Sequence, residues 1–273
     1  MNKVGFMQGR LSPVINGMIQ AFPWNTWEDE FRIANKININ LMEWTLDFDN
    51  LYKNPLMYDD GRKRIQHLSD IFKIKINSLT GDCFMQYPFW KSEEAEFKKL
   101  TKVFKDVSKA CALMGIEFVI VPLVDNGSLK SNVEEKKIIN FFFEEQEFFQ
   151  DIGVKVIFES DFNPQRLKNF ISHFNNDIYG INYDIGNSAA LGFNVIDEME
   201  CYGDRILNIH VKDRPYDGTT VPLGQGDANF DLIFKLFKEI GYKGNYILQT
   251  ARVSQDHDKL IKKYHNMVKN WMS

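Results

Sequence analysis

The stretch VKVIFESDFNPQRLKNFISHFNNDIYGINYDIGN (154–187) contains one complete strand–helix–strand unit. Its two ends, 154–159 and 179–184, are short, rich in β-branched and aromatic residues, and mostly apolar without alternation. This pattern is typical of parallel strands that are covered on both faces. Between them, Asn163 and Pro164 predict the N-cap and the first position of a helix. The buried face of that helix is predicted to consist of Leu167, Phe170, Ile171 and Phe174.

The same unit recurs outward from this stretch in both directions. Six further segments have the character of buried strands: 3–7, 39–44, 74–79, 117–122, 206–211 and 245–249. Successive strands start roughly 25 to 42 residues apart, which is the length a strand–helix unit needs. Eight units without a long linker predict a single (β/α)₈ TIM barrel, one domain over residues 1–273. A doubly wound open sheet is the alternative, but the first turn has no GxGxxG motif and the count of eight favours closure.

Composition bounds the classes of function. Hydrophobic residues make up 44% of the chain, enough for a sizeable core, and the net charge is -4. An acidic balance argues against a nucleic-acid partner. Three widely spaced cysteines, Cys83, Cys111 and Cys201, predict neither a disulfide framework nor a zinc knuckle. We find no segment typical of a signal peptide or a membrane span, so we expect a cytoplasmic protein without a membrane partner.

Metal-capable side chains stand at the ends of the last four predicted strands. They are Glu159, Asp184, His210 and Gln249. In a barrel of this kind the strand ends converge on the active site. Each residue alone has a structural interpretation: an ion-pair partner, a turn cap, a core histidine or an ordinary amide. Their placement on four consecutive strands instead favours a site for one divalent metal ion, Mn²⁺, Mg²⁺, Co²⁺ or Zn²⁺.

Three motifs carry a resemblance to a known family. DIGN (184–187), HVKDR (210–214) and PLGQGDANF (222–230) resemble the xylose-isomerase-like TIM-barrel superfamily of sugar and sugar-phosphate isomerases and epimerases. The resemblance implies one divalent metal ion held by Glu159, Asp184, His210 and the residue at position 249. It also implies a sugar or sugar-phosphate substrate and the possibility of a homo-oligomer.

Two positions depart from the family pattern. The fourth metal ligand of the family is a glutamate, whereas this chain has Gln249. The family also often has a histidine three residues after the aspartate that corresponds to Asp184, whereas this chain has Asn187. An amide oxygen can bind a metal but cannot accept a proton. The expected reaction is therefore an isomerisation through an ene-diolate, with Glu159 as the only base of the matched pair. Five acids near strand ends could replace the missing base: Glu43, Asp82, Asp125, Asp161 and Asp213.

Other polar residues complete the expected site. Lys212 and Asp213 are expected to take part in catalysis, because the family repeats that pair. Substrate binding is assigned to Arg10, Asn187, Arg214 and Arg252, since arginine suits phosphate groups. For each of these residues, a surface charge or a structural salt bridge is the alternative.

Three other functions are alternatives. A non-catalytic sugar-binding barrel would explain the loss of glutamate at position 249, and a sugar dehydratase would use the same metal and base. The superfamily also contains metal-dependent DNA nucleases, but those need a histidine-rich metal cluster and a basic face. Only His210 of the five histidines falls on a predicted strand.

Overall fold

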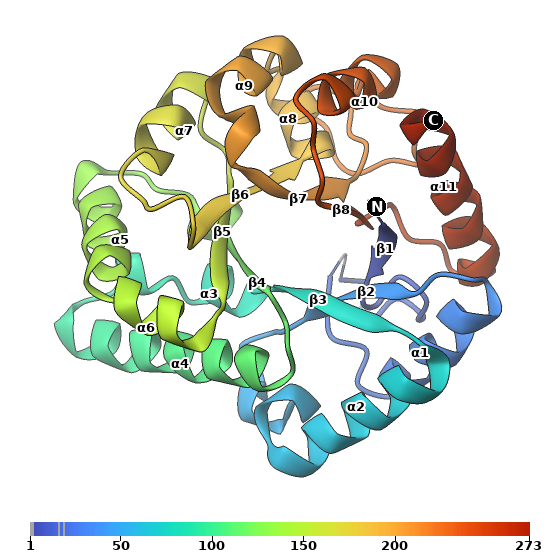
Figure 1. The fold of residues 1–273 in the computed structure, drawn as a ribbon, viewed down its shortest axis with the longest axis horizontal. Coiled ribbons are helices and arrows are strands. Elements are labelled where there is room, and N and C mark those ends of the chain that lie inside the picture. Colours follow the sequence, from blue (N-terminus) through green and yellow to red (C-terminus); the bar gives the residue numbers. More distant parts are fainter. Residues whose placement is uncertain (1–2, 16, 19) are drawn as a thin grey trace.

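The eight strands close into a barrel in chain order. The computed structural model describes residues 3–15, 17–18 and 20–273. Every neighbouring pair of strands is parallel, including β8 with β1. Helices surround the ring of strands (Figure 1). The predicted TIM barrel is confirmed. The strands are β1 (Val4–Met7), β2 (Leu41–Thr45), β3 (Lys75–Thr80), β4 (Phe118–Leu123), β5 (Lys155–Ser160), β6 (Tyr179–Asp184), β7 (Ile206–Val211) and β8 (Asn245–Leu248).

The connections between strands are helical. The α-helices of the described residues are α1 (Trp27–Lys36), α2 (Asp59–Phe72), α3 (Asp82–Gln86), α4 (Glu94–Leu113), α5 (Asn132–Glu144), α6 (Gln146–Ile152), α7 (Pro164–Ile171), α8 (Ile185–Leu191), α9 (Val195–Tyr202), α10 (Phe230–Glu239) and α11 (His257–Met272). Short 3-10 helices, η1 to η5, lie at Leu51–Lys53, Pro55–Met57, Phe89–Lys91, Asp125–Gly127 and Gly203–Arg205.

Local sequence explains where α7 begins. Pro164 is its first residue, and the side-chain oxygen of Asn163 accepts a hydrogen bond of 2.9 Å from the backbone N–H of Arg166. Proline suits this position because the first N–H groups of a helix have no intrahelical partner. The helix therefore starts where the sequence predicts, and it returns the chain to β6 beside β5.

The interior of the barrel divides into apolar and polar parts. Two small apolar clusters inside it, Met7 with Leu41 and Ile247, and Phe118 with Ile120 and Ile157, are separate from the large core between strands and helices. Polar side chains fill other buried positions on the strands: Glu43, Ser78, Thr80, Asn182, Asn208 and His210. Buried polar groups destabilise a fold unless they are hydrogen-bonded, so this polar set needs internal partners.

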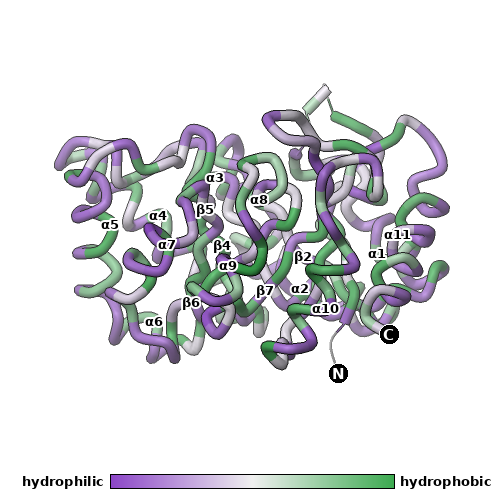
Figure 2. The backbone as a smooth tube through the Cα atoms, turned by 90° about the horizontal axis from the view of Figure 1, so that it is seen from above, coloured by the Kyte–Doolittle hydropathy of each residue, from purple (hydrophilic) through white to green (hydrophobic). Residues whose placement is uncertain are grey.

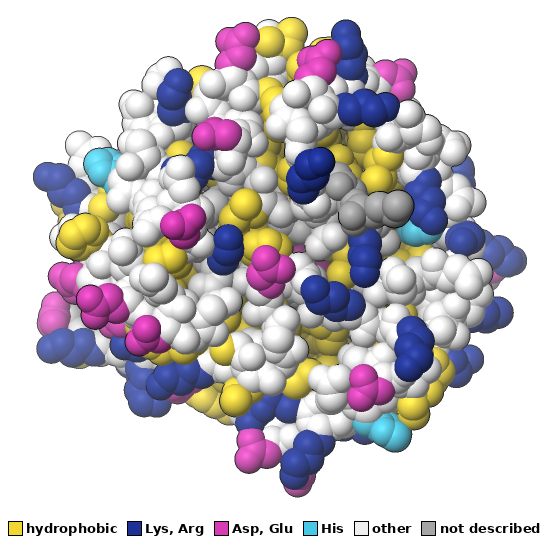
Figure 3. Space-filling view, in the orientation of Figure 1, with side chains coloured by type: hydrophobic (Ala, Val, Ile, Leu, Met, Phe, Trp, Pro, Cys, Tyr) yellow, Lys and Arg dark blue, Asp and Glu magenta, His cyan; other side chains and the backbone are white. Residues whose placement is uncertain are grey.

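The carboxyl ends of the eight parallel strands lie at the same end of the barrel. Figure 2 shows the barrel from the side, with α8, which directly follows β6, above that strand. Because all strands are parallel, their carboxyl ends lie toward the upper edge. Figure 3 shows one face, on which Lys and Arg side chains stand among Asp and Glu around the rim. No helix of the described residues is long and apolar enough to cross a membrane.

Candidate metal centre and active site

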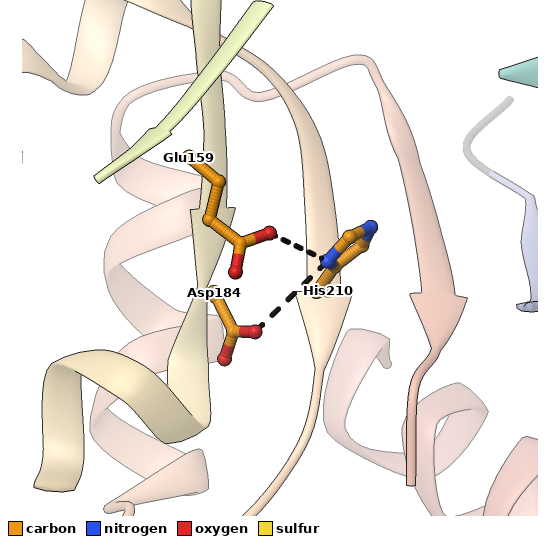
Figure 4. A group of neighbouring side chains, drawn as sticks. All are labelled: Glu159, Asp184 and His210. Carbon is orange, nitrogen blue, oxygen red and sulfur yellow. Dashed lines mark ion pairs between the residues drawn. The ribbon is translucent and has the colours of Figure 1, made fainter. Parts of the chain in front are cut away.

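Glu159, Asp184 and His210 meet inside the barrel, each from the carboxyl-terminal part of its strand (Figure 4). One ligand atom of each lies within 4.8 Å of the others. Nδ1 of His210 is 3.0 Å from Oε2 of Glu159 and 3.9 Å from Oδ2 of Asp184. All three side chains are buried. The structure therefore brings together three of the four residues in which the sequence predicts a metal site.

The strand register and a helix cap position Asp184. It pairs with His210 in the ladder between β6 and β7. Its Oδ1 accepts a hydrogen bond of 2.9 Å from the backbone N–H of Asn187, which caps α8. This bond occupies one carboxylate oxygen and leaves Oδ2 toward the cluster.

Glu43 on β2 orients the imidazole of His210 from the opposite side. Oε1 of Glu43 lies 2.8 Å from Nε2 of His210. The same carboxylate accepts hydrogen bonds from Ser78 Oγ at 2.6 Å, Thr80 Oγ1 at 2.5 Å and Asn208 Nδ2 at 3.1 Å. Burial acts to raise the pKa of Glu43, but the charge of His210 and these hydrogen bonds outweigh it and lower the pKa. Glu43 is thus a buried, ionised carboxylate with saturated acceptors.

His210 carries a proton on both ring nitrogens in this arrangement. Burial acts to lower its pKa, but the charges of Glu43 and Glu159 and the hydrogen bonds to them raise it to about 10. The imidazolium therefore bridges the two carboxylates. Nδ1 is the nitrogen that faces Glu159 and Asp184, so His210 would hold a metal ion there only after Nδ1 has lost its proton.

Two asparagines hold the Glu159 carboxylate. Asn182 Nδ2 donates to Oε2 at 2.9 Å, and Asn187 Nδ2 donates to Oε1 at 2.8 Å. Burial acts to raise the pKa of Glu159, but the hydrogen bond and charge of His210, the charge of Lys212 and the Asn182 bond lower it overall. Glu159 is therefore ionised and able to accept a proton.

Lys212 lies between Asp184 and Gln249, the residue predicted as the fourth metal ligand. Its Nζ lies 2.6 Å from Oδ2 of Asp184 and donates to Oε1 of Gln249 at 3.1 Å. Gln249 directly follows β8, and its backbone N–H donates to Val211. The ammonium group thus neutralises Asp184, whose pKa burial nevertheless raises. Lys212 links the two predicted ligands that do not contact His210 at hydrogen-bond distance.

The donor set fits a divalent metal ion once two positive charges have left it, namely the proton on Nδ1 of His210 and the ammonium group of Lys212. Two carboxylates and an imidazole are oxygen and nitrogen ligands suited to such ions. With its proton on Nε2 donated to Glu43, His210 would present the lone pair of Nδ1 to the cluster, an outer carboxylate–histidine arrangement common at metal sites. The metal would displace the Nδ1 proton and the Lys212 ammonium, and Gln249 Oε1 could then become the fourth ligand.

A cavity of about 340 Å³ adjoins the cluster. This volume suits a small molecule of the size of a monosaccharide. Residues predicted from the sequence line it from several strand ends: Arg10, Glu159, Asn187, Lys212, Arg214 and Gln249. Further lining residues include Gln20, Thr80, Asp82, Asp125, Thr219 and Thr220.

Arg10 and Arg214 reach this cavity, each anchored by a carbonyl. Arg10 is buried, and its Nε donates to the carbonyl of Thr250 at 3.0 Å. Arg214 donates from Nε and Nη2 to the carbonyl of Gly218 at 2.9 and 2.7 Å, and from Nη1 to Asn187 Oδ1 at 2.7 Å. Because Asn187 also contacts Glu159, Arg214 is coupled to the candidate base through a single side chain.

Arg252 lies to one side of the cavity. Its Nη2 donates to the carbonyls of Ser12 and Pro13 at 3.0 and 2.8 Å. It is not among the described residues that line the cavity. Its expected role in substrate binding stays a prediction, and these contacts attach the loop after β8 to the loop after β1.

Asp213 holds the loop that follows β7. Its Oδ2 accepts hydrogen bonds from the backbone N–H groups of Gly224 at 2.7 Å and Gly226 at 2.9 Å, and its Oδ1 accepts one from Ala228 at 3.3 Å. A Cβ atom at Gly226 would clash with Oδ1 of Asp213, which explains the glycine. Asp213 is fully buried and is not among the described residues that line the cavity. A catalytic role for it stays a prediction.

The sequence interpretation missed three members of the site. Asn182 and Asn208 were not singled out, and Glu43 was considered only as a substitute base. Asn182 stands two residues before Asp184, and Asn208 two before His210, so the alternation of a strand places each on the same inward side as its metal-capable neighbour. That periodicity was the signal that could have found them.

Comparison with known proteins identifies the family of the chain. The family model for the xylose isomerase-like TIM barrel matches residues 31–271. The chain belongs to this family. Among curated relatives, the putative L-ribulose-5-phosphate 3-epimerase SgbU of Haemophilus influenzae is 23% identical over 248 residues, which are 84% of this chain and 86% of the relative. An L-ribulose-5-phosphate 3-epimerase UlaE of Escherichia coli is 22% identical over 259 residues, 90% of each chain.

Solved structures share the fold over nearly the whole chain. The IOLI protein with a bound zinc atom superposes with a TM-score of 0.76 at 17% identity, covering 99% of this chain and 98% of that one. The D-allulose 3-epimerase of Methylomonas sp. gives a TM-score of 0.76 at 14% identity, with the same coverage. The two curated relatives are named as sugar-phosphate epimerases, and one solved structure with the same architecture contains a bound zinc atom.

Proposed function

We propose that this protein is a divalent-metal-dependent isomerase that acts on a sugar or sugar phosphate through an ene-diolate, with Glu159 as the base. The observation that carries the proposal is the buried cluster of Glu159, Asp184 and His210 beside a cavity that Glu159 itself lines. A metal ion held there by these residues and Gln249 would stabilise negative charge on the oxygens of a sugar during proton abstraction.

Glu159 has the properties that a base of this kind needs. It is ionised, it faces the cavity, and two asparagine amides fix its orientation. A positioned carboxylate that takes the proton beside a carbonyl accelerates such a step by about 10² to 10⁴-fold. The hydrogen bonds from Asn182 and Asn187 keep the pKa low and hold the oxygens in place before substrate binds.

Gln249 separates isomerisation from epimerisation. In the family pattern the residue at this position is a glutamate on the face opposite the strand-5 base, and inversion of a carbon needs a proton carrier on each face. Gln249 is neutral and already accepts a hydrogen bond from Lys212. Transfer of a proton between neighbouring carbons on one face requires only Glu159, so isomerisation is the reaction that this residue set supports best.

The charges around the cavity favour an anionic or polyhydroxylated substrate. Arg10, Lys212 and Arg214 line it together with Thr219 and Thr220. Guanidinium groups bind phosphate in a bidentate manner, and hydroxyl-rich side chains suit sugar hydroxyls. We therefore infer that the substrate is a sugar phosphate or a free sugar of comparable size.

The experiment is a substrate screen in D₂O. The protein would be incubated with Mn²⁺, Co²⁺, Zn²⁺ or Mg²⁺ and with L-ribulose 5-phosphate, D-tagatose, D-allulose and their aldose counterparts, and products would be followed by NMR. Interconversion of ketose and aldose that requires metal and falls at least about 10²-fold in Glu159→Gln would support the proposal.

Other products would contradict it. An epimer formed by the natural protein would show that a second base exists on the opposite face. A product that has lost one water would make the protein a dehydratase. Binding of the sugars without turnover under every metal condition would favour a barrel that has kept its cavity and lost catalysis.

A further inference from the structure

Asp82 is a buried carboxyl group that lines the candidate active-site cavity just after the end of β3. It directly follows Gly81 after the strand and is the first residue of α3. Its exposed fraction is 7%, and it lines the same cavity as Glu159. The sequence interpretation names it only as one of five acids near the strand ends.

One carboxyl oxygen of Asp82 takes no part in the hydrogen bonding among the described residues. Within the described part of the chain, its Oδ2 is buried and has no hydrogen-bond partner. Burial raises the pKa of Asp82 to about 8; the charges of Asp47 and Glu159 act in the same direction, and those of Arg10 and His210 oppose them. A buried, unpaired carboxyl oxygen destabilises a fold, so its retention beside a cavity points to a ligand.

The other four acids named from the sequence lack this combination of burial, an oxygen without a partner and contact with the cavity. Both carboxylate oxygens of Glu43 are hydrogen-bonded, to His210, Ser78, Thr80 and Asn208.

Asp213 is bound to the loop after β7. Asp161 is not among the described residues that line the cavity, and Asp125 lines it but is exposed to solvent. Asp82 is therefore the acid that combines burial, an unpartnered oxygen and contact with the cavity.

We propose that Asp82 is a second catalytic residue, which carries the proton between the two oxygens of the sugar while Glu159 carries the proton between the two carbons. This inference rests on the proposed isomerase function. The two groups line one cavity, Asp82 from the start of α3 and Glu159 from β5, and neither task requires Gln249 to accept a proton.

The proton and electron balance closes over one turnover. In the first half, Glu159 removes the proton on the carbon beside the carbonyl, the C–H electron pair forms the C=C bond, and the C=O pair moves onto the carbonyl oxygen. In a separate step, that oxygen then takes the proton of Asp82. In the second half, the Asp82 carboxylate removes the proton from the neighbouring hydroxyl, and the O–H pair forms the new C=O bond. The C=C pair then takes the proton back from Glu159 at the adjacent carbon, which regenerates both acids in their starting states.

The test measures conversion and deuterium exchange separately. Wild type, Asp82→Asn, Glu159→Gln and the matched control Asp161→Asn would be incubated in D₂O with the sugar panel described above. Conversion to product and deuterium incorporation into recovered substrate would both be followed. For Asp82→Asn we expect conversion to fall about 10² to 10³-fold with KM changed by less than about threefold. We also expect the ratio of exchange to conversion to rise at least about tenfold, because Glu159 still removes the carbon-bound proton.

The controls separate this inference from the function on which it rests. Glu159→Gln should lose exchange and conversion together, and Asp161→Asn should match wild type. Asp82→Ala should regain activity with added formate, which covers the case in which the asparagine variant does not fold. Conversion by Asp82→Asn within about tenfold of wild type, or a parallel loss of exchange and conversion, would overturn the role of Asp82 alone. A wild type with neither exchange nor conversion would overturn the isomerase proposal and this inference with it.

Discussion

Gln249→Glu should strengthen metal binding, and the structure allows the size of the effect to be worked out. With an effective dielectric constant of about 20, an added unit charge at a reference separation of about 4 Å gains about 8 kcal/mol against a divalent ion. The same charge would also hold the Lys212 ammonium, which lies 3.1 Å from Oε1 of Gln249, by about 5 kcal/mol. The metal must displace Lys212, so the net gain is about 3 kcal/mol, or roughly 10²-fold in the dissociation constant.

The measurement is isothermal titration of Mn²⁺ and Zn²⁺ into metal-free protein at constant pH. Gln66→Glu, an exposed position on α2, adds the same charge away from the site and serves as the control. We expect the dissociation constant to fall for Gln249→Glu and to stay unchanged for the control. An unchanged or weaker affinity in Gln249→Glu would show that position 249 does not face the ion, and the reasoning about the fourth ligand would fail.

Three further predictions concern stability. Glu43→Ala should lower the free energy of unfolding by about 3–5 kcal/mol in denaturant titrations, because it removes one of the two carboxylates beside the buried His210 and leaves the donors Ser78, Thr80 and Asn208 without their acceptor; Glu28→Ala, an exposed ion-pair position, should change it by less than about 1 kcal/mol. Asp213→Ala should increase amide hydrogen exchange in residues 214–228, and unchanged exchange there would contradict its loop-holding role. Burial lowers the pKa of His265 to about 4, so folding holds this histidine neutral and stability falls as pH drops below about 6.5. By pH 4.5 the loss should reach at most about 3 kcal/mol, and His265→Leu should abolish that part of the pH dependence.

The fold was predictable because its signals are local. Each strand is a short apolar segment, and helix caps such as Asn163 with Pro164 bind backbone groups only a few residues away in the sequence. All eight strands fall within two residues of the predicted starts, the largest shift being at Leu41 of β2. The closed order follows from parallel strands joined by right-handed crossovers, which leave few other arrangements.

The site was predictable only in part. Residues at strand ends could be expected to meet, because the barrel brings those ends together, and Glu159, Asp184 and His210 do so. The pairing of Glu43 with His210 spans 167 residues, and no local pattern encodes a contact of that range. The placement of Lys212 between Asp184 and Gln249 depends on side-chain rotamers, which the sequence does not specify.

Metal content per chain tests the central claim most directly. Purified wild type, His210→Ala, Asp184→Asn and the exposed-site control His67→Ala would be loaded with Mn²⁺ or Zn²⁺, passed through a desalting column and measured by elemental analysis. The account predicts close to one ion per chain in wild type and His67→Ala, and a loss of that ion in both site variants. Wild type without metal, or metal retained in His210→Ala and Asp184→Asn, would contradict a metal centre at this cluster.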